Sequence, residues 1–382
     1  MTARAPAGPA GTTVRHLGRC LHPDHDALLA RTAEPSVFLT ASWLRSWFEV
    51  FGALHRPVNL VVEEGGDLVG AAPLVVRRPE RRFPFRMLVV AGQHPTSGEY
   101  LEPFARPGRE TEVAGAVVDE LTGSARRHWD VLIVQRTPAD SPMVAALVAA
   151  LAGRSVPTRL IDTGTAPYCA LPADPDALLR GRSRNFRSQV RQTRNRMARL
   201  GTVELHQIGP GDTAPAGPQA GPHDQGAGSV PGPDPLTGLD EVIRLHRLRW
   251  GTRSSFDTAP KLAFHHRLAR RFAAEGRLYL SLLRSAGTTI AGRYDFVYAG
   301  KMWCIQGGWD PDHAAVRPGL YLTDAALRWG AARGLREYDF LGGAADYKTR
   351  WATGHRPLAT LTAANPATVR GRAYAHRVTH RG

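Results

Sequence analysis

Three side chains in the last third of the sequence have the chemistry of an acid–base site. Lys348 is one of only three lysines in the chain and follows a glycine pair, where a point cation could stabilise an oxyanion or a phosphate. Tyr347, beside it, could donate a proton. Asp339 lies within an apolar segment, and a buried carboxylate must be paired or have a raised pKa. Asp339 is therefore either a general base or the partner of a cation such as Arg336.

Groups of this kind suit the transfer of an acyl group to an amine. The amine must be neutral to attack, the acyl oxygen must be stabilised as it becomes anionic, and the leaving group must take a proton. The sequence shows no Ser-His-Asp or Cys-His signature, which favours direct attack over a covalent enzyme intermediate. Its three cysteines, Cys20, Cys169 and Cys304, form no CxxC pair, so we expect neither a disulfide framework nor a metal site.

The elements that must position these groups form one strand–helix–strand unit. Residues 301–309 are rich in aromatic and apolar residues and predict a strand. Arg317-Pro318-Gly319 then opens a helix, and residues 338–341 predict a short buried strand. A parallel crossover of this kind binds ligands where strands end and helices begin. We expect the backbone N–H groups of Gly319 and Leu320 to be unpaired at the helix start, where they could hold an anion.

These motifs resemble the FemAB/CelD-type branch of the GNAT acyltransferase superfamily. The resemblance is carried by Arg317-Pro318-Gly319-Leu320, Tyr338-Asp339-Phe340, and Asp346-Tyr347-Lys348 followed by Trp351, with weaker matches at Phe38 to Trp47, Gly98-Glu99-Tyr100 and the arginines near Arg184. Together these pieces extend over most of the chain, from about Ser36 to Leu358. The resemblance implies an α/β (α+β) fold of tandem GNAT-like halves, each a mixed, mostly antiparallel sheet flanked by helices.

The resemblance also implies roles for particular residues. The second half would be catalytic, with Lys348, Tyr347 and Asp339 as its candidate catalytic residues. The acyl donor would be bound at Arg317, Gly319 and Leu320. An acidic–aromatic pair, Glu99 and Tyr100, would face a cleft between the halves and bind the substrate together with Trp351. Of the two glycines in the usual acetyl-CoA loop of this superfamily, only Gly319 is present.

An arginine-rich segment lies upstream of these motifs. Residues 177–201 contain eight arginines and no acidic residue, with apolar residues at helical spacing. Like charges three or four positions apart destabilise a helix, so a helix that accumulates them favours contact with an anion. Arg184 and Arg187 are therefore candidates for contact with phosphate or nucleic acid. The alternatives are a solvated charged face and a coding bias, since the net charge of +15 is carried almost wholly by arginine.

The length of 382 residues suggests two domains or one large one. We expect a flexible N-terminal arm over residues 1–35, a first half over 36–165, a second half over 166–365 and a basic tail over 366–382. A Gly/Pro-rich insert over 209–238 should be disordered inside the second half. No run of 18 or more apolar residues and no signal-peptide pattern occurs, so we expect no membrane span and a cytoplasmic protein.

Hydrophobic periodicity predicts the remaining elements. In the first half it predicts helices near residues 38–51, 112–126 and 143–151, and strands near 59–63, 68–77, 86–90 and 131–135. In the second half it predicts helices at 177–201, 239–250 and 261–274, and strands at 203–208, 278–284, 289–298 and 358–362.

The leading interpretation is an N-acyltransferase, in the simplest case an N-acetyltransferase. It would move an acyl group from acetyl-CoA or another acyl-CoA to a small-molecule or cell-envelope amine. The first alternative is a Fem-like aminoacyltransferase that uses aminoacyl-tRNA, which the arginine-rich segment and the incomplete acetyl-CoA loop favour. The second alternative is a non-catalytic nucleic-acid-binding protein on the same fold.

Overall fold

The computed structural model describes residues 11–96, 98–200, 203–210, 234–343 and 345–379. The chain forms two compact units: unit 1 takes residues 1–165 and 356–382, and unit 2 takes residues 166–355. The chain passes between the units within two strands, β7 (Thr158–Ala170) and β13 (Gly354–Ala364). Among the helices of the described residues, none is long and apolar enough to cross a membrane.

Unit 1 is built on a mixed sheet with the strand order β1-β2-β3-β4-β6-β13-β7, and β5 pairs with β3. Its other strands are β1 (Thr12–His16), β2 (Arg56–Glu64), β3 (Asp67–Arg77), β4 (Met87–Val90), β5 (Phe104–Ala105) and β6 (Val131–Pro138). Its helices are α1 (His25–Leu29), α2 (Ala41–Phe51), α3 (Glu110–Thr122), α4 (Pro142–Ala152) and α10 (Val369–Thr379). Strands β2 and β3, predicted near residues 59–63 and 68–77, pair antiparallel as a hairpin, and β4 and β6 run parallel.

Helix α2 shows how the aromatic spacing of the sequence builds the core of unit 1. The hydroxyl of Thr40 accepts the N–H of Trp43 and caps the helix. Trp43 and Trp47 are each 1% exposed, and their indole N–H groups donate to the carbonyls of Gly92 at 3.1 Å and His94 at 3.0 Å. These aromatic residues are core, because both their rings and their polar atoms have partners inside the unit.

Unit 2 has the strand order β7-β12-β11-β10-β9-β8. Its strands besides β7 are β8 (Val203–Ile208), β9 (Leu278–Ser285), β10 (Thr288–Tyr298), β11 (Lys301–Trp309) and β12 (Glu337–Asp339). Its helices are α5 (Arg184–Ala198), α6 (Pro235–Trp250), α7 (Ala259–Ala274), α8 (Pro318–Ala332) and α9 (Asp346–Trp351). The predicted strand–helix–strand unit is β11, α8 and β12, with the two strands parallel.

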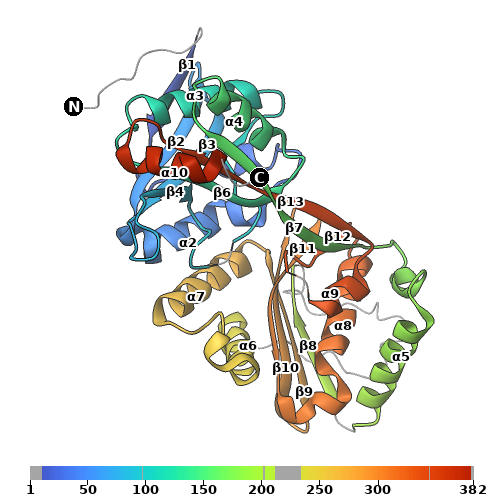
Figure 1. Cartoon of the computed structure of the whole chain (residues 1–382). Helices are drawn as coiled ribbons and strands as arrows, with labels where there is room; N and C mark the ends of the chain where they lie inside the picture. Colours follow the sequence, from blue (N-terminus) through green and yellow to red (C-terminus); the bar gives the residue numbers. More distant parts are fainter. Residues whose placement is uncertain (1–10, 97, 201–202, 211–233, 344, 380–382) are drawn as a thin grey trace. The chain divides into compact units, whose positions relative to one another are not determined.

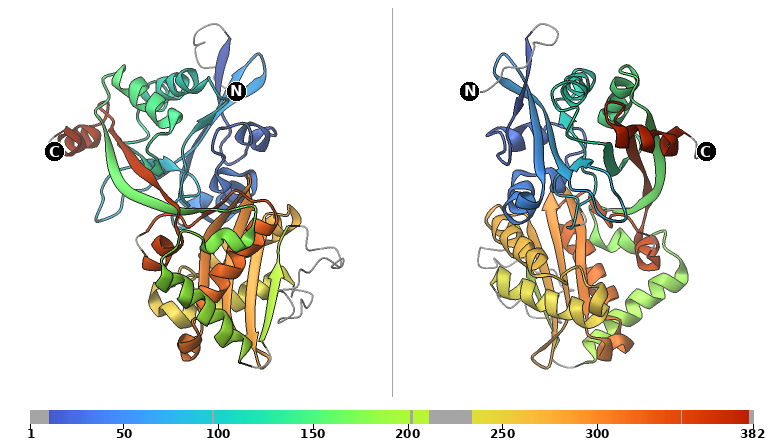
Figure 2. Two further views of the ribbon diagram at one scale, coloured as in Figure 1. Left: turned by 90° about the vertical axis from the view of Figure 1, so that its right-hand side faces the viewer. Right: turned by 60° about the vertical axis from the view of Figure 1, so that its left-hand side comes forward.

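The helices of unit 2 cover both faces of its sheet (Figure 1). Helices α6 and α7 lie on one face, and α5, α8 and α9 lie on the other. The two views of Figure 2 agree with this arrangement, since α5 and α8 come in front of the strands in the left view and α6 and α7 in the right view. Helix α5 buries an apolar stripe, Phe186, Val190 and Met197, in the apolar clusters that include residues of α8 and of the sheet.

The expected flexible arm is wrong for residues 12–35. Strand β1 pairs antiparallel with β2 from Thr12↔Glu64 to His16↔Leu60, and the imidazole of His25 in α1 is buried and bonds to the carbonyl of Leu39 at 2.7 Å. The alternation in β1 is too short and too polar to be recognised as a strand in isolation, because its partner supplies the pairing. Residues 1–10 lie outside the described residues.

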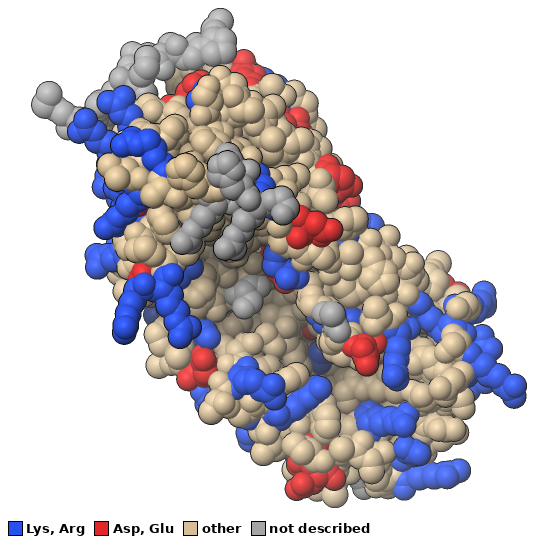
Figure 3. Space-filling model, viewed as in Figure 1, with Lys and Arg blue, Asp and Glu red and all other residues tan. Residues whose placement is uncertain are grey.

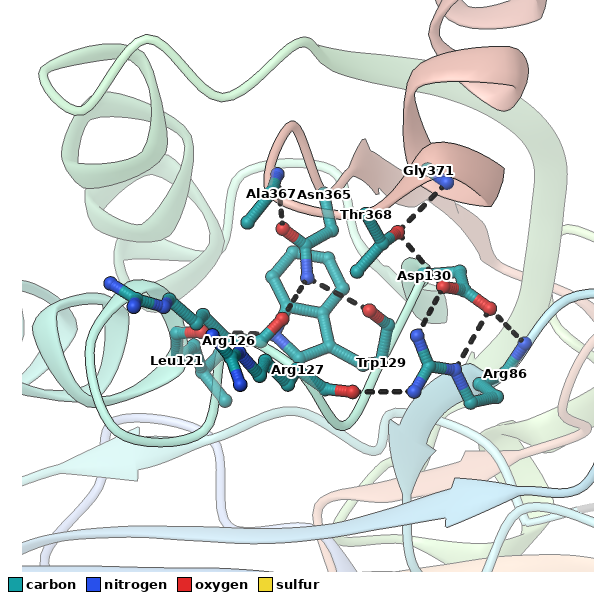
Figure 4. Close-up of polar contacts among 10 residues, drawn as sticks. All are labelled: Arg86, Leu121, Arg126, Arg127, Trp129, Asp130, Asn365, Ala367, Thr368 and Gly371. Atoms are coloured by element: carbon teal, nitrogen blue, oxygen red, sulfur yellow. Dashed lines mark hydrogen bonds and ion pairs between the residues drawn. The ribbon is translucent and has the colours of Figure 1, made fainter.

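The segment expected to be a basic tail, residues 366–382, includes helix α10 and belongs to unit 1. Figure 4 shows how this segment is fixed to unit 1. The side-chain amide of Asn365 donates to the carbonyls of Arg126 at 2.7 Å and Trp129 at 2.8 Å, and the hydroxyl of Thr368 donates to Asp130 at 2.8 Å. Residues 356–365, expected in the second half, likewise belong to unit 1, because β13 pairs with β6. The expected division at residue 165 coincides with the boundary between the units.

The predicted helix over residues 177–201 is interrupted. A 3₁₀ helix, η3 (Pro175–Leu179), precedes α5, and Gly181 between them has φ 75°. Ser183 then caps α5 by accepting the N–H of Phe186 at 3.2 Å. The glycine and the serine cap outweigh the apolar periodicity on which the prediction rested. The central part of the predicted 209–238 insert, residues 211–233, lies outside the described residues.

Candidate active site

A cavity of about 840 Å³ lies in unit 2, between α5, the end of α6, β11, the start of α8, and α9. Six basic side chains line it: Arg249, Arg253, Arg293, Arg317, Lys348 and Arg350. Within the described part of the chain, no Asp or Glu side chain lines it. A cavity lined by charge of one sign concentrates ions of the opposite sign. This cavity is therefore suited to an anionic ligand.

Strand β11 runs along the cavity. In the described part of the chain, β12 pairs only with residues 301–303 of β11, and residues 304–309 all line the cavity. A strand edge without a neighbouring strand offers backbone N–H and C=O groups to an extended ligand. The end of β11 therefore provides a row of backbone groups beside the basic side chains.

A β-bulge in β11 decides which side chains reach the cavity. In the pairing with β10, Asp295 opposes Cys304 and Tyr294 opposes Gln306, so Ile305 is an extra residue. Directly opposed residues share a face of a sheet, and the bulge therefore places Cys304 and Gln306 on opposite faces. The N–H of Ile305 donates to the carboxylate of Asp295 at 3.2 Å. One strand thus supplies polar side chains to both sides of the cavity.

A buried polar network holds this bulge on the α8 face. Arg293 is 6% exposed, and its guanidinium donates to Asp295 at 2.6 Å, to the hydroxyl of Thr323 at 3.0 Å and to the thiol of Cys304 at 2.9 Å. The hydroxyl of Tyr338 accepts from Arg293 at 2.8 Å and donates to Asp295 at 2.6 Å. Burial raises the pKa of Asp295, an effect that Arg293 opposes. A satisfied network of this kind fixes a single geometry.

Helix α8 begins at the cavity. The preceding residue, Arg317, has a left-handed backbone with φ 55° and ψ 55°. The N–H of Gly319 has no hydrogen-bond partner among the described residues, whereas the N–H of Leu320 donates to the carbonyl of Arg317 at 3.1 Å. The expectation that both groups are free is therefore wrong for Leu320, because the turn at Arg317 directs its carbonyl toward the first turn of the helix. A Cβ at Gly319 would lie only 3.2 Å from Trp309.

Two of the predicted catalytic residues lie on α9, and both line the cavity. Tyr347 is 41% exposed, yet its hydroxyl interacts with the buried Cys304, and desolvation raises the pKa of Tyr347. The ammonium of Lys348 donates to the carbonyls of Gly342 at 2.8 Å and Leu341 at 3.5 Å. Lys348 therefore closes the glycine turn after β12 while it borders the cavity.

Two other predicted site residues are fully buried. The carboxylate of Asp339 accepts the N–H of Leu341 at 2.7 Å, and Asp339 is not among the residues that line the cavity. Trp351 lines the cavity and packs edge-on against Phe186 at 4.9 Å. Asp339 thus shapes the turn that Lys348 closes, and Trp351 supports the wall.

The end of α6 forms a polar wall on the other face of the sheet. His246 is 3% exposed and bonds to Gln306 at 2.9 Å and to Ser254 at 2.9 Å, and the amide of Gln306 donates to Ser255 at 3.0 Å. Burial lowers the pKa of His246 to about 4, so the ring is neutral at pH 7. The close approach depends on Gly308, because a Cβ there would lie 2.2 Å from the backbone nitrogen of His246.

Helix α5 carries the predicted phosphate-binding arginines. Arg194 is paired with Asp324 at 2.7 Å, and Arg187 donates to a backbone carbonyl at 3.0 Å. Arg184 and Arg191 are exposed, and neither has a hydrogen-bond or ion-pair partner among the described residues. Figure 3 shows basic side chains gathered where α5 lies in Figure 1. Arg187 and Arg194 therefore bond to the protein itself, whereas the side chains of Arg184 and Arg191 are available to a ligand.

Glu99 and Tyr100 lie in unit 1, and neither is among the residues that line the cavity of unit 2. Glu99 pairs with Arg136 at 3.3 Å. Tyr100 is buried with φ 52°, and its N–H donates to the carbonyl of Arg136 at 3.3 Å. These two residues and the predicted catalytic residues thus belong to different units.

Arg293, Asp295 and Gln306 were not singled out from the sequence. A signal for the first two was present. Arg293 and Asp295 are two positions apart in an apolar strand, so they share a face, and buried charges must be paired. The place of Gln306 carried no such signal, because the bulge reverses the face that simple alternation predicts.

The segment that builds this cavity matches a known family. Residues 184–349 match the family model described as an acetyltransferase (GNAT) domain. The matched segment extends from the first residue of α5 into α9 and so includes β11, α8 and β12. This match agrees with the GNAT resemblance that the motifs of the second half carry. Among curated proteins, none matches the sequence at a significant level.

Solved structures share the fold at low sequence identity. A crystal structure of FemX has a TM-score of 0.64 at 11% identity, over 96% of this chain and 100% of that chain. The C-terminal domain (DUF2156) of a putative lysylphosphatidylglycerol synthetase from Agrobacterium fabrum has a TM-score of 0.52 at 12% identity, over 88% and 90%. A conserved protein of unknown function from Bacteroides thetaiotaomicron has 0.51 at 12%, over 92% and 99%. The predicted tandem GNAT-like fold is confirmed.

Proposed function

We propose that unit 2 transfers an acyl group from an acyl-CoA to an amine by direct attack. The observation that carries this proposal is a cavity with six basic side chains and, among the residues that the structure describes, no acidic one, extending from the end of β11 to the first turn of α8. Coenzyme A carries a pyrophosphate and a thioester at the two ends of an extended arm. A basic helix start and an unpaired strand edge are suited to these two parts.

The start of α8 is the proposed site of the pyrophosphate. The free N–H of Gly319 and the positive end of the helix dipole both favour an anion there. Arg317 adds a guanidinium at the same place, and the missing side chain of Gly319 lets the phosphate approach the backbone. The arm of the donor then lies along residues 304–309, toward Tyr347.

The chemistry requires one bond to form and one to break. The neutral amine attacks the acyl carbon, the carbon–sulfur bond breaks, and the proton that the amine nitrogen loses is balanced by the proton that the leaving thiolate gains, with Tyr347 able to relay it. Tyr347 supports the last step, because it lines the cavity and its hydroxyl is protonated at pH 7. Lys348 places a positive charge beside the developing anion. We propose no role as a base for Asp339, whose carboxylate bonds to the backbone of the turn.

The donor site can be tested by thermal unfolding with acetyl-CoA. At a concentration 100 times Kd, acetyl-CoA should stabilise the parent by about 2.7 kcal/mol. Gly319→Asp puts a side chain and a negative charge against the phosphate and should abolish this gain, whereas Thr349→Asp, on the exposed side of α9, should retain it. Tyr347→Phe should retain protection but lower turnover by roughly 10²-fold. A parent protein that no CoA thioester protects would contradict the proposal.

An aminoacyl-tRNA is the second candidate donor. The observation that favours it is that Arg184 and Arg191 are unpartnered on α5, while Gln189 of the same helix lines the cavity. A long polyanion bound in the cavity would pass over these arginines. Under this alternative, charged tRNA and not acetyl-CoA protects the parent, and changing Arg184 and Arg191 to Gln weakens that protection. Equal protection by unrelated RNAs without turnover would instead favour a nucleic-acid-binding protein.

A further inference from the structure

A second set of cations lines the cavity, separate from those at the start of α8. Arg249 lies over the rings of Trp250 at 4.7 Å and Trp309 at 4.8 Å, and Arg253 lies over Trp250 at 5.9 Å. Both arginines are exposed, and neither has an ion-pair or hydrogen-bond partner among the described residues. Trp250 is itself 37% exposed. We call Arg249, Trp250 and Arg253 the cation–aromatic wall. Its two guanidinium groups have no acidic partner among the described residues and are suited to bind an anionic ligand.

Stacking prepares these guanidinium groups for a ligand. A guanidinium that lies over an aromatic ring keeps its donors in the plane of the group, where they can form paired bonds to a carboxylate or a phosphate. The rings also restrict the side chain before binding, so less conformational entropy is lost. Desolvation lowers the pKa of Arg249, and the opposing effect comes from Tyr347 and not from a carboxylate.

The position of the wall separates it from the proposed donor site. Arg249 and Arg253 are carried by the end of α6 and by the following 3₁₀ helix η4 (Gly251–Arg253), next to the Ser255 that Gln306 holds. Trp309 contacts both regions, since it stacks on Arg249 and lies against Gly319. A ligand bound at the cation–aromatic wall therefore lies beside the donor without occupying its phosphate site.

We propose that the acceptor is an amine that also carries an anionic group, a carboxylate or a phosphate, which the cation–aromatic wall binds. This inference rests on the proposed function. The wall would also act on the amine itself, because nearby positive charges disfavour the ammonium form and increase the neutral fraction that attacks. This effect matters in a cavity that no carboxylate lines within the described residues.

Thermal unfolding with saturating CoA present tests the wall directly. N-acetylglycine and inorganic phosphate serve as anionic probes, N-acetylglycinamide is the neutral match, and sodium chloride equalises the ionic strength. At a tenfold excess over Kd, an anionic probe should raise Tm by about 2 °C, and the neutral probe should not. The double variant Arg249→Gln/Arg253→Gln should lose this shift. Arg270→Gln, on the exposed face of α7, should keep it. If N-acetylglycine gives the larger shift in Tm, the wall prefers a carboxylate; if inorganic phosphate does, it prefers a phosphate.

Three results separate the possibilities. If neither anionic probe exceeds sodium chloride, or if the double variant responds like the parent, the inference is overturned. If the double variant loses protection by acetyl-CoA instead, the two arginines bind the donor, and the assignment to the acceptor is overturned. If acetyl-CoA fails to protect even the parent, the proposed function fails. An anion shift without CoA that still needs Arg249 and Arg253 would then support the wall alone.

Discussion

Each unit of the molecule holds a fully buried aspartate with an arginine, but the two pairs support different things. In unit 1, Asp130 accepts the backbone N–H of Arg86 at 2.9 Å, its guanidinium at 2.6 Å, and the hydroxyl of Thr368 at 2.8 Å (Figure 4). In unit 2, Asp295 accepts from Arg293, from Tyr338 and from the N–H of the bulge residue Ile305. The first pair fastens a chain end, and the second fixes the geometry of a cavity.

The comparison shows that a buried ion pair does not reveal its use by itself. Removing one partner of either pair leaves a buried charge without a counterion. The presence of a buried ion pair is nevertheless weak evidence that the pair stabilises the fold. What differs is the third partner: a helix cap in unit 1, and a displaced strand residue next to a cavity in unit 2. The arginines differ too, since the side chain of Arg86 is 33% exposed and that of Arg293 is 8% exposed.

The largest expected effect comes from removing the more buried arginine. Arg293→Met leaves Asp295 buried without its cation and should lower local stability in unit 2 by about 3–5 kcal/mol. Arg86→Met should cost less, because water can reach the place of a side chain that is one third exposed. Hydrogen exchange of β10 and β11, compared with that of β4 and β6, measures both effects separately. Equal losses would mean that exposure does not distinguish the pairs.

Acid should affect helix α7 of unit 2 and the Asp130 contacts of unit 1 over different pH ranges. Burial lowers the pKa of His265 in α7 to about 3, so the folded state binds fewer protons than the unfolded state between about pH 3 and 6.5. The resulting stability is present above pH 6.5 and is lost as pH falls, by at most about 1.4 kcal/mol per pH unit. Asp130 behaves differently. Burial by itself raises the pKa of Asp130, but hydrogen bonds from Arg86 lower it below its ordinary value. The contribution of Asp130 to folding stability is therefore lost only below about pH 4.

The variant His265→Phe tests this difference. Phenylalanine keeps an aromatic ring against Phe256 and Phe264 and removes the titrating group. We expect hydrogen exchange in α7 to become less sensitive to acid between pH 6.5 and 4.5, with exchange in α10 unchanged. An unaltered pH dependence of α7 would assign the acid sensitivity to another group, of which His246 is the nearest candidate.

The smallest expected effect concerns the hydrogen bond between Thr368 and Asp130 in unit 1. Thr368→Val removes the hydroxyl that donates to Asp130 and accepts the N–H of Gly371 at 2.9 Å. A loss of about 1 kcal/mol follows from one hydrogen bond and one helix cap. Faster hydrogen exchange should be confined to α10, and the acetyl-CoA response of unit 2 should not change. A change in that response would show that the hydrogen bond between Thr368 and Asp130 affects more than α10.

Most elements could be predicted from periodicity because their apolar faces are buried as the patterns require. Residues 301–309 and 318–332 are examples in which a strand pattern and a proline–glycine start suffice. Strand β7 was missed, because its burial alternates weakly and its pairing partner comes from a distant part of the chain. Pairing between distant segments leaves little trace in a local window.

The candidate site was predicted less completely than the fold. Tyr347, Lys348 and Gly319 do line one cavity, and their roles remain a prediction. The cation–aromatic wall could not be predicted, because it depends on α6 passing within 2.2 Å of the place where a Cβ of Gly308 would be. Such an approach is a property of two packed elements and not of either sequence segment.

The bulge at Ile305 makes the number of residues in β11 as important as their identity. Asp295 holds the backbone N–H of Ile305 and makes no demand on its side chain, so many residue types should be tolerated at this position. Loss of one residue would instead restore simple alternation, turn Gln306 away from His246 and put a different residue in the place of Gly308. Mutational tolerance at this strand should therefore differ sharply between substitutions and single-residue deletions. A one-residue gap at this point in a comparison of related chains would mark the loss of a two-sided cavity.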